Sequence, residues 1–274
     1  MVIAAQQKFE VATISGQNIA HIKRGQAALS VRGLSVSYGE APVLFSVDVD
    51  FPKEQMCAII GPNGAGKSTL IKAVLGIVPK LSGDVMLHGQ RIGKNNKNIA
   101  YVPQRASIDW DFPVTVKDVV EMGLYQKVGL LGRLSTKTHR SKVYECLDHV
   151  GMADFMDRQI GQLSGGQQQR VFLARSLAQD ADVYLLDEPF AGVDAATEKA
   201  IVQVLQRLKQ KKKTVIAVHH DLASVDQYFD HVTLLNTRLI ASDQTDEAFT
   251  NENLHHAYGG ALSLTQLDGY KQPS

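Results

Sequence analysis

The chain has 274 residues, of which 44% are hydrophobic, 21% are charged and 7% are aromatic, and its formal net charge is +1. This length can bury a substantial core in one or two domains. A nearly neutral chain lacks the strongly basic surface of nucleic-acid-binding proteins, so DNA and RNA are not expected as partners. The short basic run 209–213 falls where a helix is predicted to end, and it suits the negative end of the helix dipole.

Three further observations limit the cellular setting. No stretch approaches the roughly 18 consecutive apolar residues that a membrane-spanning helix needs, so any membrane role requires docking onto another chain. Lys8 and Glu10 interrupt the region that would have to form an apolar signal, so a secretory signal is not expected. Cys57 and Cys146 lie far apart in the sequence and predict two reduced, buried thiols.

The amino-terminal part predicts an extension followed by antiparallel strands. Residues 1–28 show no clear periodicity, and no function is assigned to them. Apolar and polar residues alternate over 29–36 and 43–51, as in strands of a partly exposed antiparallel sheet. The apolar run 56–60 predicts a buried strand, which leads through a glycine-rich loop into a helix-like segment, 68–75.

The remainder of the chain alternates short apolar strands with helices. Strands are predicted at 85–87, 99–102, 183–186 and 214–218, with a terminal hairpin at 232–242. Apolar spacing predicts helices at 167–178 and 197–209, and mainly helical structure over 115–165 with a polar break at 129–138.

Together these elements predict an α/β fold with a parallel sheet at its core, an antiparallel β subdomain and a helical subdomain. The helical subdomain is expected at about 115–165. We expect one domain over residues 29–260, followed by a C-terminal tail over 261–274.

A glycine-rich segment joins the predicted strand 56–60 to the helix that follows it. It matches the pattern G-x-x-x-x-G-K-[ST] and consists of Gly61, Pro62, Asn63, Gly64, Ala65, Gly66, Lys67, Ser68 and Thr69. Backbone N–H groups in such a loop surround phosphate oxygens at the N-terminus of a helix. We expect Lys67 to reach the β and γ phosphates, Ser68 to bind Mg²⁺ and Thr69 to contact a nearby phosphate oxygen. The motif predicts a P-loop NTPase core without specifying the reaction.

Two acidic residues, Asp187 and Glu188, end the predicted strand 183–186. We expect them beside the phosphate loop, because ligand sites gather at the carboxyl ends of parallel strands. Neighbouring residues of an extended chain face different ways, so the two acids can have different roles. We expect Asp187 to hold Mg²⁺ through its water shell and Glu188 to act as the general base for the attacking water. A purely structural acidic turn is the alternative.

A third motif, Leu-Ser-Gly-Gly-Gln at 163–167, makes the chain resemble the ATP-binding subunits of ABC transporters. The resemblance covers residues 29–260 and implies the fold of an ABC nucleotide-binding domain that binds ATP and Mg²⁺. The motif would open a helix and present N–H groups to an anion through Ser164, Gly165, Gly166 and Gln167. Because the chain carries one set of motifs, the resemblance implies a two-fold symmetric homodimer. Each ATP would lie between the phosphate loop of one subunit and this motif of the other.

Four further positions match the family pattern. Tyr38 would stack on adenine, although an ordinary strand tyrosine is the alternative. Gln104 would reach Mg²⁺ and the attacking water, and His220 would contact the γ-phosphate and position the base. Asp194 would lie in the loop that crosses the dimer interface, or form the N-cap of the next helix, or do both. We expect His219 to be structural, and the histidine pair is not expected to bind metal because adjacent strand residues face opposite ways.

The segments 106–113, 116–123 and 252–260 resemble importers of manganese, zinc or chelated iron. The Asp-Trp-Asp-Phe-Pro run favours manganese. Exposed aromatic residues beside Gln104 would form a groove for a helix of a membrane partner, whereas local packing of Trp110 and Phe112 is the alternative. The implied partners are integral-membrane permease subunits and, indirectly, a solute-binding protein. The chain would then be peripheral, on the cytoplasmic face of the membrane.

Two other functions are compatible with an ATP-binding cassette. Non-transport ABC ATPases that act on ribosomes usually carry two cassettes in one chain, and those that act on DNA usually carry a long coiled coil or DNA-reading domains. This chain has one cassette with only a short insertion between Gln104 and Leu163. A module that binds ATP without turnover is disfavoured because Glu188 and His220 are both present. We therefore expect an ATPase that powers import of a divalent metal ion.

Overall fold

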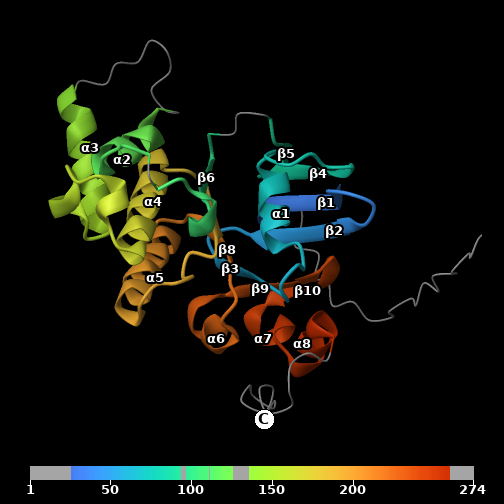
Figure 1. Ribbon diagram of the computed structural model, residues 1–274. Coiled ribbons are helices and arrows are strands. Elements are labelled where there is room, and N and C mark those ends of the chain that lie inside the picture. The colour runs from blue at the N-terminus through green and yellow to red at the C-terminus, as the bar shows by residue number, and fades with distance from the viewer. Residues whose placement is uncertain (1–25, 94–96, 111, 126–135, 260–274) are drawn as a thin grey trace, which may run out of the picture.

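The computed structural model describes residues 26–93, 97–110, 112–125 and 136–259. The expectations for residues 1–25 of the extension, 129–135 of the polar break and the tail 261–274 lie outside this part of the chain. Figure 1 shows α2, α3 and α4 together on one side of the molecule and α1 with the antiparallel sheet on the other. A larger sheet lies between them.

The antiparallel sheet has four strands in the order β2-β1-β4-β5. The strands are β1 (Ala27–Ser37), β2 (Pro42–Pro52), β4 (Ser82–Leu87) and β5 (Gln90–Arg91). Leu29 on β1 lies opposite Phe51 on β2 and Leu87 on β4, so large apolar side chains meet on one face. This face is buried, as the alternation in the sequence predicts.

The larger sheet has six strands in the order β10-β9-β3-β8-β7-β6. The strands are β3 (Met56–Ile60), β6 (Ile99–Val102), β7 (Val183–Asp187), β8 (Thr214–Val218), β9 (His231–Asn236) and β10 (Arg238–Gln244). All pairings are parallel except that of β9 with β10, which form a hairpin. Every residue of β3, β7 and β8 is buried, which explains their continuous apolar runs.

Two hydrophobic cores lie on opposite faces of this six-stranded sheet. Alternate residues of one strand enter different cores, because successive side chains of a strand point to opposite faces. On β3, for example, Ala58 and Ile60 pack with the helical side, whereas Cys57 and Ile59 pack with α1 and the antiparallel sheet. The phosphate loop, which follows β3, is therefore anchored between two cores. Both cysteines are buried and neither forms a disulfide, as expected.

Eight α-helices and four short 3₁₀ turns complete the described residues. The helices are α1 (Lys67–Val74), α2 (Val116–Leu124), α3 (Thr136–His149), α4 (Gly165–Gln179), α5 (Ala195–Gln210), α6 (Val225–Tyr228), α7 (Thr245–Ala248) and α8 (Asn251–Tyr258). The 3₁₀ turns are η1 (Arg105–Ser107), η2 (Ala153–Phe155), η3 (Ile160–Gln162) and η4 (Leu222–Ser224). None of these helices is both long enough and apolar enough to cross a bilayer.

The helices begin where the sequence supplies caps. The Thr115 side chain accepts a hydrogen bond from the Asp118 N–H, and the Asp118 carboxylate accepts one from the Thr115 N–H, which starts α2. The structure adds two helices, α7 and α8, after the predicted terminal hairpin. In α8 only Leu254 and Ala257 are buried, which is too few apolar residues to give a visible helical pattern.

Candidate nucleotide site

The phosphate loop lies between β3 and α1 and is built around glycines. A side chain at Gly61 would place its Cβ 2.0 Å from the Leu235 carbonyl oxygen, so this position has no room for one. Gly66 has φ of +93° and caps α1, and a Cβ there would lie 2.5 Å from a methyl carbon of Leu44. The loop is tied to the β9–β10 turn because the Thr237 N–H donates to the Ala65 carbonyl at 3.0 Å.

Lys67 closes back over the loop. Its ammonium donates to the carbonyls of Gly61 at 2.8 Å and Pro62 at 2.9 Å, and the residue is buried. Burial lowers the pKa of Lys67, while the nearby charges of Glu188 and Asp187 act in the opposite direction. The ammonium is therefore held at the centre of the loop by carbonyls, in a place where phosphate oxygens would be stronger partners.

Asp187 is placed at the end of β7, next to the first turn of α1. The Ser68 hydroxyl donates to Asp187 Oδ1 at 2.7 Å, and Asp187 is 0% exposed. Its other oxygen, Oδ2, is buried and has no hydrogen-bond partner within the described residues. Burial raises the pKa of Asp187, and the Ser68 hydrogen bond partly opposes this shift. A hydroxyl and a buried, unsatisfied carboxylate oxygen form a donor set that suits Mg²⁺.

Glu188 and Gln104 meet beside this pair, although 84 residues separate them in sequence. The Gln104 amide Nε2 donates to Glu188 Oε2 at 2.8 Å. Glu188 has φ of +53°, an uncommon conformation for a residue other than glycine, and it turns this side chain away from the strand direction. The structure thus gives the two neighbouring acids separate partners.

The two histidines follow β8, whose last residue, Val218, pairs with Asp187. His219 is 1% exposed and its Nε2 lies 2.8 Å from the Ser224 hydroxyl. Its ring packs edge-on against Phe190, with centroids 5.4 Å apart. Burial lowers the pKa of His219 to about 4, so it is neutral at pH 7. His220 is exposed at this strand end, and within the described residues no group of three or more His, Cys, Asp or Glu side chains is placed to hold a metal ion.

The Ser164 turn begins α4. The Ser164 hydroxyl accepts a hydrogen bond from the Gln167 N–H at 3.4 Å, and the Gln167 side chain accepts one from the Ser164 N–H at 2.9 Å. This reciprocal cap leaves the N–H groups of Gly165 and Gly166 at a helix N-terminus, where anions bind. Ser164 is exposed, in contrast to the buried Lys67.

Tyr38 and Asp194 lie at the margins of the site. Tyr38 is 61% exposed, so its ring is available for stacking on a ligand. Asp194 is the N-cap of α5: it accepts hydrogen bonds from the Thr197 N–H at 2.8 Å and the Thr197 hydroxyl at 3.1 Å. These bonds lower the pKa of Asp194. The capping alternative is therefore observed, and it does not conflict with a second role at an interface.

The aromatic residues after Gln104 separate into two environments. Trp110 packs edge-on against Phe172, with centroids 5.3 Å apart, and its indole N–H donates to the Arg105 carbonyl at 3.0 Å. Local packing therefore accounts for Trp110. Phe112 is 57% exposed and remains available to a partner.

Arg105 is a residue that the motifs did not identify. It follows Gln104 directly, and its Nε donates to Gln168 Oε1 at 3.0 Å, next to the Ser164 turn. The only signal in the sequence is its place beside Gln104, because the contact joins positions 63 residues apart.

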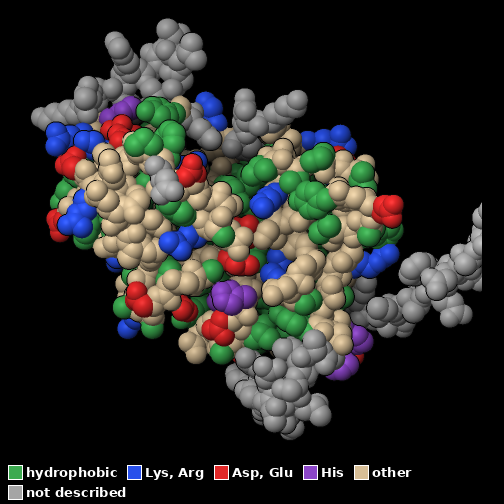
Figure 2. All heavy atoms as spheres, in the orientation of Figure 1, with side chains coloured by type: hydrophobic (Ala, Val, Ile, Leu, Met, Phe, Trp, Pro, Cys, Tyr) green, Lys and Arg blue, Asp and Glu red, His purple; other side chains and the backbone are tan. Residues whose placement is uncertain are grey.

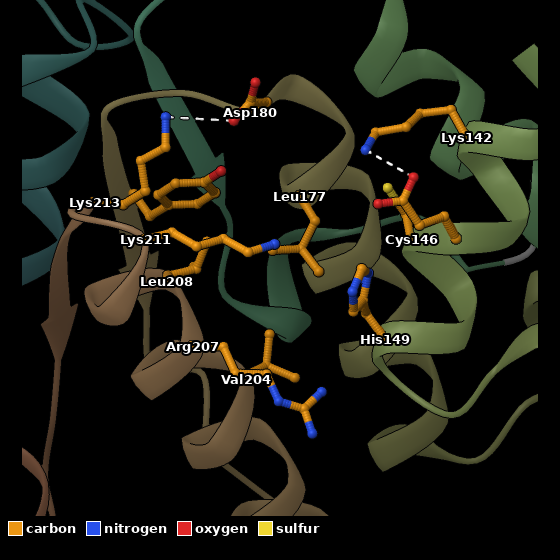
Figure 3. Close-up of a pocket in the computed structure, with 12 residues that line it drawn as sticks. Lys142, Cys146, His149, Leu177, Asp180, Val204, Arg207, Leu208, Lys211 and Lys213 are labelled. Atoms are coloured by element: carbon orange, nitrogen blue, oxygen red, sulfur yellow. Dashed lines mark hydrogen bonds and ion pairs between the residues drawn. The ribbon is translucent and has the colours of Figure 1, made fainter. Parts of the chain in front are cut away.

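Figure 2 shows acidic, basic and histidine side chains meeting in the middle of one face, between the helical part and the antiparallel sheet. The cavity in Figure 3 lies elsewhere, between α3, α4 and α5, and has a volume of about 80 Å³. Cys146, Leu177 and Leu208 contribute to its lining, and an ion pair of 3.3 Å joins Lys213 and Asp180 at its edge. None of the expected site residues lines this cavity, so it is separate from the candidate site.

Comparison with known proteins agrees with this geometry. The ABC transporter family matches residues 44–191. The chain is 53% identical over 247 residues to the zinc transport system ATP-binding protein TroB of Treponema pallidum (strain Nichols), covering 90% of this chain and 92% of that protein. It is 51% identical over 243 residues to the manganese transport system ATP-binding protein MntB of Bacillus subtilis (strain 168), covering 87% of this chain and 97% of that protein.

Among solved structures, a dimeric, post-hydrolysis state of an ATP-binding cassette bound to ADP and Pi has a TM-score of 0.69 and 25% identity. The match covers 79% of this chain and 98% of that one. The expected fold class is thus confirmed, as is the resemblance drawn from the Leu-Ser-Gly-Gly-Gln motif. The chain belongs to the ABC transporter family, as one of its nucleotide-binding proteins that hydrolyse ATP.

Proposed function

We propose that this ATPase powers the import of a divalent metal ion through integral-membrane permease subunits, with manganese as the first choice of ion. The main structural support for ATP hydrolysis is the hydrogen bond of 2.8 Å between Gln104 and Glu188, which lies beside the phosphate loop. Support for metal transport comes from the names of the two relatives, one assigned to zinc and one to manganese. The ion is cargo of the permease and does not contact this subunit.

The triphosphate binds along the phosphate loop, at the N-terminus of α1. Loop N–H groups from Gly64 to Thr69 surround the phosphates, and Lys67 exchanges its two carbonyl partners for β and γ oxygens. Tyr38 stacks on the adenine. This half of the site is complete within one chain.

Mg²⁺ fits the pair formed by Ser68 and Asp187. The Ser68 hydroxyl would bind the ion directly, and the unsatisfied Oδ2 of Asp187 would hold it through water. Gln104 would be a further ligand. The ion, when bound, neutralises charge that develops on the phosphate oxygens.

Glu188 acts as the general base. Its Oε2 accepts the hydrogen bond from Gln104, so the carboxylate is oriented while its other oxygen can accept a proton from the attacking water. His220 contacts the γ-phosphate and helps to position the base. Proton removal from water at the γ-phosphate is the step in which these residues act together.

The second half of each site comes from another copy of the chain. The Ser164 turn closes over the γ-phosphate bound by the partner subunit, and Asp194 lies in the loop that crosses the interface. Two ATP molecules are then buried in a two-fold symmetric dimer. Support comes from the exposed, capped turn at Ser164 and from the dimeric state of the similar cassette.

The permease docks beside the Gln104 loop, at the exposed Phe112 and at Met122 and Tyr125 of the helical part. These apolar side chains suit a helix of a membrane protein. The chain is accordingly peripheral, on the cytoplasmic face, and a solute-binding protein delivers the ion from the other side.

Replacing the base tests the ATPase mechanism. Glu188→Gln should retain ATP binding, lower turnover by about 10³-fold and accumulate as an ATP-bound dimer, because the general base is lost. Turnover and mass in solution are measured with ATP and Mg²⁺. A Glu188→Gln protein that stays monomeric and fully active would remove both the base assignment and the dimer.

Uptake of radiolabelled ions tests the cargo. Cells that lack this chain should lose manganese uptake, and the wild-type chain, but not Glu188→Gln, should restore it. Parallel measurements with zinc and iron discriminate between the ions. If manganese uptake is unchanged while zinc or iron uptake is lost, the cargo is zinc or iron and the choice of manganese is wrong.

A further inference from the structure

Arg105 reaches the Ser164 turn from the loop that carries Gln104. Its Nε donates to Gln168 Oε1 at 3.0 Å, and its guanidinium carbon lies 3.1 Å from the position that a Cβ on Gly165 would occupy. Gly165 is the first residue of α4. A positive charge therefore lies beside the first turn of the helix.

This placement is electrostatically unfavourable by itself. A helix N-terminus carries a partial positive charge, which repels a cation and attracts an anion. Arg105 is an exposed residue, so its guanidinium is accessible to a ligand. A cation and a helix N-terminus that face the same space form a site for an anion.

Two neighbouring side chains orient the guanidinium. Its acceptor Gln168 is 3% exposed and is itself fixed by donating to the Ile160 carbonyl at 3.2 Å. The guanidinium also lies over the Trp110 ring, 5.7 Å from its centroid. Glycine at position 165 leaves the space that the guanidinium fills. The arrangement is preorganised for a ligand with oxygen acceptors.

We propose that Arg105 binds the terminal phosphate of the nucleotide that the Ser164 turn receives from the partner subunit. The inference rests on the proposed function, since it requires the ATP-bound dimer. One short segment, 104–105, then contacts both nucleotides of the dimer: Gln104 acts at the site of its own subunit, and Arg105 acts at the site of the partner. Arg105 also links the two sites mechanically, because it is the sequence neighbour of Gln104. The side-chain amide of Gln104 donates to Glu188 at 2.8 Å.

The test compares dimer formation by Glu188→Gln with and without Arg105→Ala. The dimer dissociation constant in saturating ATP should rise about tenfold for each of two sites, hence about a hundredfold, because each site loses charge-assisted hydrogen bonds. The affinity of the monomer for ADP should stay within about twofold, since Arg105 does not contact the nucleotide of its own subunit. Arg105→Lys keeps the charge without the forked geometry and should give an intermediate constant.

Two further variants distinguish phosphate binding from a structural role. Arg158→Ala removes a guanidinium that lies over the Phe155 ring at 4.8 Å, elsewhere in the helical part, and should leave the dimer constant unchanged. Gly165→Ala should displace Arg105 and weaken the dimer. The increase in dimer dissociation constant caused by Gly165→Ala should be smaller in a protein that already carries Arg105→Ala, because the two changes remove the same interaction.

The outcomes separate this inference from the proposed function. If Glu188→Gln dimerises in ATP equally well with and without Arg105, the Arg105 assignment is wrong and the dimer stands. If ADP affinity falls in parallel with dimerisation, Arg105 is structural and the assignment is again wrong. If Glu188→Gln stays monomeric in saturating ATP, the proposed dimer is wrong and the Arg105 assignment falls with it.

Discussion

The two turns proposed to bind phosphate, the loop 61–69 and the Ser164 turn, share one chemistry but differ in how the rest of the chain supports them. The loop lies between two hydrophobic cores, and its lysine is buried and bonded to two carbonyls of the loop. The Ser164 turn is exposed and is capped mainly by its own residues. The loop is anchored by buried residues at both of its ends, whereas the Ser164 residue that begins the other turn is exposed.

This difference fits the proposed function, in which one chain carries halves of two different sites. The anchored loop, Ser68, Asp187, Glu188 and Gln104 are connected by hydrogen bonds within one chain. The Ser164 turn instead has a helix N-terminus with its own cap and the guanidinium of Arg105 beside it. In the proposed function this turn receives a nucleotide bound by another copy, and variants of each turn can test that division.

The largest expected effect is complementation between two inactive variants. Lys67→Ala disables the phosphate loop, and Ser164→Glu places a carboxylate where the partner's γ-phosphate would bind, so each alone should lose at least about 100-fold in turnover. Mixed in equal amounts, they should recover about a quarter of wild-type turnover, because half of random pairs are mixed and each has one intact site. Turnover of the mixture measures this directly.

The matched control mixes Lys67→Ala with Glu188→Gln. Both residues belong to the same half of the site, so every mixed pair has two damaged sites and turnover should stay low. Recovery in this control, or no recovery in the first mixture, would contradict the assignment of Ser164 to the opposite half.

The sequence predicted the surroundings of the loop 61–69 better than those of the Ser164 turn. The loop 61–69 and the acids 187–188 are local patterns that follow apolar strands, and strand order then brings them together. The contact between Arg105 and Gln168 spans 63 positions, and no local pattern encodes it. Thr115 and Asp118 form a capping box, so the start of α2 was readable, whereas α8 buries too few apolar residues to be seen.

Lowering the pH should reduce the free energy of unfolding, because the buried His219 is neutral in the folded chain. Burial lowers the pKa of this histidine to about 4, below its ordinary value in the unfolded chain, so the unfolded state binds more protons between those two values. Its contribution to stability is present above pH about 6.5 and is lost as pH falls toward 4, at about 1.4 kcal/mol per pH unit for one proton. His231, whose pKa is also lowered to about 4, should contribute a similar slope.

His219→Leu should therefore reduce, but not remove, the fall in unfolding free energy between pH 6.5 and 4. Leucine fits between Phe190 and Phe229, and Ser224 keeps Asp221 as a hydrogen-bond partner, so stability at pH 7 should change little. Denaturant unfolding at several pH values gives the slope. An unchanged slope would mean that His219 is protonated in the folded state.

The smallest expected effect separates the two roles of Asp194. Asparagine is an equally good N-cap, so Asp194→Asn should preserve the melting temperature, whereas Asp194→Ala should lower it by about 3 °C because the Thr197 N–H loses its acceptor. If Asp194 also crosses the dimer interface as a charged group, both variants should lose turnover, and they should lose it to a similar degree. If it is only a cap, Asp194→Asn should be as active as the wild type. Melting curves and turnover measured on the same preparations distinguish the cases, because a cap acts on its own helix while an interface charge acts on the site of the partner.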